Sequence, residues 1–130
     1  MLSSEKLVLN ILGFTRTDIR PFAYAMDIVV DLLFKQKISK TNIKITKDIY
    51  PVVAQKLHKS SHAVAKSAQR IAALCWDTAR RNNLIVELFG RPLIETPATH
   101  DILFYLAVLL YFGKPFFTVL QDLDDLNFSA

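Results

Sequence analysis

The chain has 130 residues, of which 52% are hydrophobic and 22% charged, with a formal net charge of +4 at pH 7. This length is typical of one domain, and so much apolar material excludes an intrinsically disordered chain. We therefore expect a single domain over residues 1–130. One cysteine, Cys75, excludes an internal disulfide, so nothing indicates an oxidising compartment.

Positive charge is concentrated in the middle of the chain. Residues 35–81 hold eleven Lys or Arg against two acids, Asp48 and Asp77, a net charge of +9, whereas the remainder is acidic. A block of one sign favours a polyanionic partner, because neutralising phosphates releases condensed counterions. An anionic membrane or an acidic protein would fit the same charge.

The first third of the chain is predicted to form two helices. One covers about residues 3–12 and ends at Gly13 as a left-handed residue. The other covers about 18–34, with Pro21 in its first turn, where a missing N–H costs little. Two residues before it offer a capping side chain, Thr17 and Asp18.

The middle of the chain begins with a lysine-rich connection over residues 35–45, where Ile43 and Ile45 alternate as in a strand. A third helix is predicted over about 49–58, with Asp48 as its N-cap. A fourth is predicted over about 61–78, capped by Ser60 or Ser61.

The last third is predicted to be helical as well. A helix over about 82–89 ends at Gly90, another runs from Thr99 or His100 to Phe112, and a short one covers about 116–125. The apolar run 102–112 is too short for a bilayer, which takes about 20 residues, and reads as a buried core helix. The sequence thus predicts an all-α bundle of six or slightly more helices.

The fourth helix has two distinct faces. Its predicted buried stripe has the spacing i, i+4, i+7, i+11 and consists of Val64, Ala68, Ile71 and Cys75. The opposite face carries His62, Lys66, Gln69, Arg70, Ala73 and Asp77. A short polar turn, HKSS, joins this helix to the third, which predicts a helix-turn-helix whose second helix enters the major groove of DNA. The alternative is an ordinary amphipathic helix with a solvated face.

Two groups of side chains are candidates for contacting DNA. Arginine and lysine donate to guanine, and glutamine pairs with adenine, so the base-reading candidates are His62, Lys66, Gln69 and Arg70. Phosphate contacts fix register without reading sequence, and the candidates for them are Lys47, Lys56, Lys59, Ser60, Ser61, Arg80 and Arg81.

Several motifs, taken in order, are similar to a known family. They are LNILGF, IRPFAYAMDIVVDLL, ITKDIYPVVAQKL, a tryptophan nineteen residues later (Trp76), LFG and PATHDILFYLAVLL. The most specific residues are Ile45, Thr46, Lys47, Tyr50, Pro51, Ala54 and Lys56. Over about residues 7–112 the chain resembles the C-terminal effector domain of stage 0 sporulation protein A, a response regulator of endospore formation, and 113–130 forms an extension.

This resemblance implies a six-helix bundle with a helix-turn-helix. It also implies a bacterial, cytoplasmic, nucleoid-associated transcription regulator that binds duplex DNA as tandem copies. The family's phosphorylatable receiver domain has no room in this chain, so we expect no control by aspartyl phosphorylation within it.

The chain departs from the family in the reading helix. Family members place arginine, glutamate and arginine where this chain has Ala63, Ala65 and Lys66. Each lost bidentate base contact removes roughly 1–3 kcal/mol of discrimination. We therefore expect either a different preferred sequence or DNA binding with little preference.

No enzyme, cofactor or metal site is expected. His58 and His62 have a metal-binding spacing, but no third ligand accompanies them. Cys75 lies on the buried stripe, where a packed, inert thiol is favoured. The sequence has no phosphate-cradling glycine loop and no Gly-x-Ser-x-Gly motif, and it indicates no small-molecule substrate.

The C-terminal region favours contact with another chain. The helix ending at Phe112 is apolar nearly all round, and Phe116, Phe117, Val119 and Leu120 follow it. We expect a homodimer or another protein partner here, and no membrane; the alternative is a tail that folds back over its own core. A rival function is therefore an interaction module that keeps the fold but has lost specific DNA reading.

Overall fold

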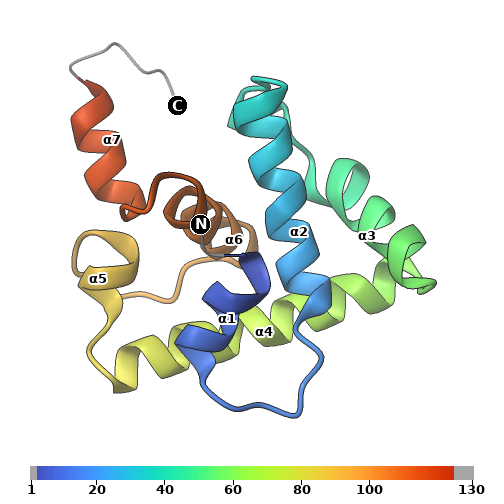
Figure 1. Ribbon diagram of the computed structural model, residues 1–130, viewed down its shortest axis with the longest axis horizontal. Coiled ribbons are helices and arrows are strands. Elements are labelled where there is room, and N and C mark those ends of the chain that lie inside the picture. Colours follow the sequence, from blue (N-terminus) through green and yellow to red (C-terminus); the bar gives the residue numbers. More distant parts are fainter. Residues whose placement is uncertain (1–2, 125–130) are drawn as a thin grey trace.

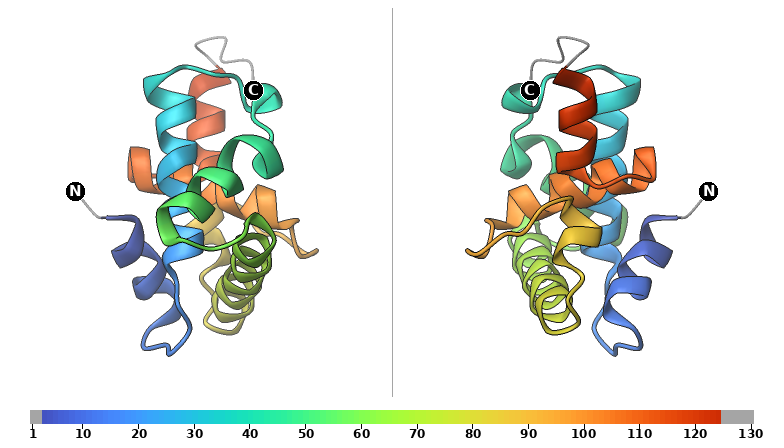
Figure 2. Two further views of the ribbon diagram at one scale, coloured as in Figure 1. Left: turned by 90° about the vertical axis from the view of Figure 1, so that its right-hand side faces the viewer. Right: turned by 90° about the vertical axis from the view of Figure 1, so that its left-hand side faces the viewer.

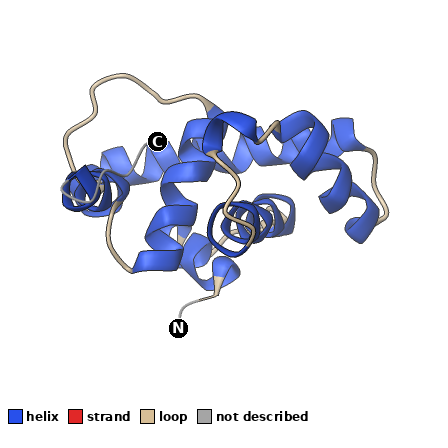
Figure 3. Ribbon diagram, turned by 90° about the horizontal axis from the view of Figure 1, so that it is seen from above, coloured by secondary structure: helices blue, strands red, loops and turns tan. Residues whose placement is uncertain are grey.

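The computed structural model describes residues 3–124, and the regular secondary structure of these residues is helical (Figure 1). These residues form seven α-helices and no strand, which confirms the predicted all-α class. Seen from above, the helices are joined by short turns and a few longer loops (Figure 3). The seven are α1 (Ser4–Leu12), α2 (Arg20–Val30), α3 (Tyr50–Leu57), α4 (Ser61–Arg81), α5 (Ile85–Phe89), α6 (Thr99–Phe112) and α7 (Phe116–Asp124).

The N-terminal helix begins at a serine cap. The Ser3 hydroxyl accepts a hydrogen bond from the N–H of Lys6 at 3.2 Å. The predicted end of this helix at Gly13 is confirmed, but the predicted left-handed helical conformation of that glycine is wrong. Its φ is +73° but its ψ is −153°, so the chain leaves the helix in an extended direction instead of curling back.

Helix α2 begins later than predicted. Its N-cap is Ile19, which has no capping side chain, and neither Thr17 nor Asp18 occupies that position. Asp18 instead approaches from outside the helix and accepts the N–H of Arg20 at 3.0 Å. Pro21 lies in the first turn as predicted. The helix continues as a π-helical turn over Asp31–Lys35.

The connection to α3 contains two turns that the sequence did not predict. A 3₁₀ turn covers Lys40–Asn42, and a π-helical turn over Ile45–Ile49 leads into α3. Asp48 is not the cap of α3, because its carboxylate accepts the N–H of Lys44 at 2.8 Å and so closes the preceding turn. The strand-like alternation at Ile43 and Ile45 produces no strand in this described connection.

The end of α4 also differs from the prediction. This helix continues to Arg81, and the fifth helix starts at Ile85, three residues after its predicted start. Asn83 adopts a left-handed φ of 58°, and the N–H of Leu84 donates to the carbonyl of Ala79 at 2.8 Å, which ends α4. The predicted ends of α5 at Gly90 and of α6 at Phe112 are confirmed.

The core lies between α2, α4 and α6. Its largest side chains are at most 1% exposed: Trp76 of α4, Phe22 and Met26 of α2, and Phe89 of α5. α6 contributes Leu103 and other buried side chains, so its predicted role as a core helix is confirmed. Within the described residues no single helix is long and apolar enough to cross a membrane; α6 and α7 pass that test only as a pair bent by 66°.

Helix α7 folds back along the bundle. It packs against α6 and α5, with Val119 buried and Phe116 and Phe117 half-buried. Figure 1 shows α7 standing beside α5 and the end of α6. The structure thus describes the predicted extension over 113–130 only as far as Asp124. This part of the extension packs on the core of the same chain.

Replacing Gly90 by alanine is expected to destabilise the protein more than the same change at Gly113. Both glycines have a positive φ, so each substitution costs about 1 kcal/mol in backbone strain. Only at Gly90 would the new Cβ lie 2.9 Å from a backbone atom, the Thr118 nitrogen. We expect Gly90→Ala to lower the free energy of unfolding by about 2–3 kcal/mol in urea titrations. Equal losses in the two variants would contradict the close packing of α7 on Gly90.

Candidate nucleic-acid interface

Helices α3 and α4 are joined by a three-residue turn whose geometry is set by local hydrogen bonds. His58 adopts the left-handed conformation, with φ 56° and ψ 46°, and the N–H of Lys59 donates to the carbonyl of Ala54 at 2.9 Å. Ser60 then caps α4: its hydroxyl accepts the N–H of Ala63 at 3.1 Å. This confirms one of the two predicted caps and places the start of α4 at Ser61.

The two predicted faces of α4 are both confirmed. Val64, Ala68, Ile71 and Cys75 are at most 1% exposed, and burial raises the pKa of the Cys75 thiol to about 12. That thiol is therefore protonated and packed, as expected. On the other face, the base-reading candidates are all exposed: His62, Lys66, Gln69 and Arg70. Ala63 and Ala65, between the two faces, are half-buried.

The phosphate candidates are exposed but do not form one cluster. Lys59, Ser60 and Ser61 lie together at the start of α4. Arg80 and Arg81 lie at the end of this 21-residue helix, roughly 30 Å away at 1.5 Å per residue. The structure therefore brings the first group together and separates it from the second.

Some of the basic side chains already have partners. The Lys56 ammonium lies over the ring of Tyr24, 5.1 Å from its centroid. The Arg81 Nε donates to the carbonyl of Asp77 at 3.4 Å. Lys40, also in the basic block, lies 3.6 Å from a carboxylate oxygen of Asp101. Lys47 is exposed in the turn before α3.

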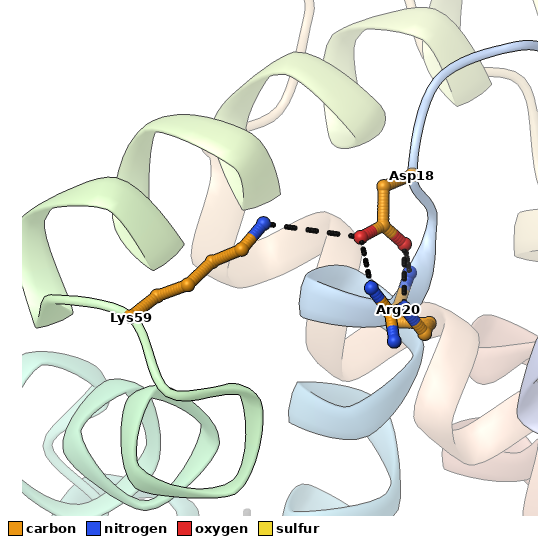
Figure 4. Close-up of polar contacts among 3 residues, drawn as sticks. All are labelled: Asp18, Arg20 and Lys59. Carbon is orange, nitrogen blue, oxygen red and sulfur yellow. Dashed lines mark hydrogen bonds and ion pairs between the residues drawn. The ribbon is translucent and has the colours of Figure 1, made fainter.

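An acidic residue outside the basic block reaches the start of α4. Asp18, in the loop before α2, accepts two hydrogen bonds from the guanidinium of Arg20, at 2.9 and 2.8 Å (Figure 4). Its second oxygen also lies 3.9 Å from the Lys59 ammonium. The Arg20 hydrogen bonds hold the pKa of Asp18 at about 2.

Sequence reasoning missed this contact, because Asp18 and Lys59 are distant in the chain. The Asp-x-Arg spacing could have indicated the pair of Asp18 with Arg20, but no local pattern indicates Lys59. Its consequence is that Lys59, a phosphate candidate, already faces a carboxylate.

The described residues contain no group of three or more His, Cys, Asp or Glu side chains that could hold a metal ion. Comparison with protein-family models, with curated proteins and with solved structures finds no match to the chain. The resemblance described above therefore depends on its motifs alone.

Asp18 is expected to make the stability of the protein sensitive to acid. Its folded pKa is below the ordinary value of 3.8, so its contribution is present above pH 4 and is lost as pH falls towards 2. The carboxylate is 38% exposed, so solvent screening limits this contribution to about 1 kcal/mol or less. Denaturant titrations of wild type and Asp18→Asn should differ at pH 7 and converge near pH 2. An equal difference at both pH values would contradict this role.

Proposed function

We propose that the protein is a bacterial transcription regulator that binds duplex DNA through a helix-turn-helix formed by α3 and α4. The observation that carries this proposal is the uncovered face of α4, where His62, Lys66, Gln69 and Arg70 lie beside a tight, capped turn. The likeness of the sequence motifs to the sporulation effector domain supports the same function. In this proposal the protein is cytoplasmic and is not an enzyme.

In the proposed complex α4 lies in the major groove. That groove is about 12 Å wide and admits one α-helix, and the N-terminal part of such a helix reaches the base edges. Arg70 and Lys66 would donate to guanine, and Gln69 would pair with adenine. Because Ala63 and Ala65 have no polar side-chain group, the specificity for a base sequence would come from the side chains on the exposed face.

The backbone of the DNA would be held mainly at the start of α4. Lys59, Ser60 and Ser61 lie together there, and Lys47 precedes α3. Arg80 and Arg81 would reach only a phosphate farther along the duplex, because α4 separates them from the first group. These contacts would supply affinity and salt dependence without sequence preference.

Selection of bound sequences from a random duplex pool, followed by salt titration, tests this proposal. We expect an enriched motif that changes in Gln69→Ala or Arg70→Ala, with a loss of about 1–3 kcal/mol of discrimination at one position each. Gln121→Ala, an exposed glutamine of α7, is the matched control and should leave the motif unchanged. Binding that shows neither enrichment nor salt dependence would rule out the proposed function.

A second candidate function is supported by an aromatic patch, which we define as Phe34, Tyr111 and Phe112. The Phe34 and Tyr111 rings stack with centroids 4.1 Å apart, and Phe112 meets Phe34 edge to face at 5.2 Å. Tyr111 and Phe112 are 39% and 40% exposed. Exposed clustered aromatics are typical of protein interfaces, so this patch favours a homodimer or another protein partner.

If the aromatic patch joins two copies, Phe112→Ser should convert a dimer to a monomer in sedimentation velocity runs. Replacing a ring that is already partly exposed should leave folding intact, which thermal unfolding would check. Val86→Ser, at a 54% exposed site on α5, is the control and should not alter the sedimentation coefficient. A wild-type monomer at high concentration would contradict the homodimer.

A further inference from the structure

The loop between α1 and α2 carries an unusual side chain. Phe14 is 93% exposed, and of the large hydrophobic residues in the described chain only Ile94, at 95%, is comparably uncovered. A phenylalanine held fully in water loses the favourable burial that its ring would otherwise gain.

Hydrogen bonds hold this loop in one shape. The N–H of Thr17 donates to the Thr15 hydroxyl at 3.1 Å, and Asp18 accepts the N–H of Arg20 at 3.0 Å. Asp18 also faces the Lys59 ammonium across 3.9 Å, which ties the end of the loop to the turn before α4 (Figure 4). Phe14 and Arg16 therefore extend from a preorganised segment, which lowers the entropic cost of binding through them.

The loop and the exposed face of α4 lie on the same side of the molecule. Helices α1, α2, α3, α5 and α6 all contact α4, and they lie above it or alongside it in Figure 1. The uncovered face of α4 is therefore directed downward in that view. Both views of Figure 2 show the α1–α2 loop extending to the same lower end of the molecule, next to α4.

The spacing suits a duplex. Asp18, at the end of the loop, faces the Lys59 ammonium of the turn before α4 across 3.9 Å, so this part of the loop lies within a side chain's length of the start of α4. The major groove is about 12 Å wide, so an element this far to the side of a helix in the groove meets the flanking sugar-phosphate strand.

The charge of the loop also suits that strand. Arg16 and Arg20 are exposed, and Lys59 faces the same Asp18 carboxylate that Arg20 contacts. The one acid of the loop, Asp18, is already bound by Arg20 and Lys59. The hydrogen bond with Asp18 is the main cause that raises the pKa of the Arg20 guanidinium, and Glu5 of α1 is a second carboxylate that raises it. Arg16 takes part in none of these contacts.

We propose that the α1–α2 loop, residues 13–18, is a second DNA-contacting element beside the reading helix. Arg16 contacts a backbone phosphate of the strand that flanks the major groove, and Phe14 packs against the adjoining sugar at the edge of the minor groove. Arginine is a common ligand of DNA phosphates, and contacts to phosphate and sugar position a protein on the duplex without reading its sequence. This inference rests on the proposed function, because it requires α4 to lie in the neighbouring groove.

The test uses the full chain and a fluorescently labelled, mixed-sequence DNA duplex, with affinity measured over a range of salt concentrations. Arg16→Ala should make the slope of log affinity against log salt shallower by about 0.9, the value of one phosphate contact. Phe14→Ala should weaken binding about threefold to tenfold with the slope unchanged, because it removes an uncharged contact. Both residues are exposed, so folding should be unaffected, as thermal unfolding would verify.

Matched controls separate the loop from general surface effects. Ile94→Ala removes an equally exposed hydrophobic residue from the α5–α6 connection, and Lys114→Ala removes an exposed cation after α6; both should bind as wild type does. Lys66→Ala on α4 reports on the proposed function itself. If Lys66→Ala weakens binding while both loop variants bind as wild type does, the loop contact is overturned and the proposed function stands. If wild type shows no salt-dependent binding, both fail.

Discussion

The burial of one face of α4 is the constraint on which the rest of the structure depends. This helix is long, and its buried residues, from Val64 to Ala79, are covered by five other helices. Trp76 contributes the largest of these side chains and packs against Phe89 with ring centroids 5.9 Å apart. Because that face is fixed in the core, the opposite face must point to solvent, and its side chains are positioned by a rigid element. Sites on rigid helices are more precise than sites on loops.

The contacts of Asp18 also fix the loop before α2 relative to α4. Without them this loop would have no polar contact with the turn before α4. The Asp18 carboxylate joins the loop before α2 to the turn before α4, although each ion pair is exposed and contributes little energy by itself. The main effect of the contact is geometric. It also means that a phosphate approaching Lys59 must compete with an internal carboxylate, so the charge available at the start of α4 is lower than the lysine count of the sequence indicates.

Sequence reasoning succeeded where structure is local and periodic. The stripe of α4 and its N-cap follow from side chains only three or four residues apart; the stripe was predicted, and Ser60 was one of the two predicted caps. It failed where a polar side chain had several acceptable partners: Asp48 closes the turn before α3 instead of capping it, and Asp18 binds Arg20 and Lys59. The left-handed residues Lys37, His58 and Asn83 were also missed, because only glycine signals that conformation clearly. The candidate site was therefore predictable along α4, but the loop before α2 was not.

The half-buried alanines of α4 relate the fold to the proposed function. Ala63 and Ala65 lie at the two borders of the exposed face, and each side chain is half-buried. In the proposed complex the direct base contacts, which discriminate between sequences, would therefore come only from the longer side chains of the exposed face. A protein of this kind can recover affinity, but not base discrimination, from additional backbone contacts. In the proposed complex the positively charged loop beside α4 would supply such backbone contacts and so add affinity without adding sequence preference.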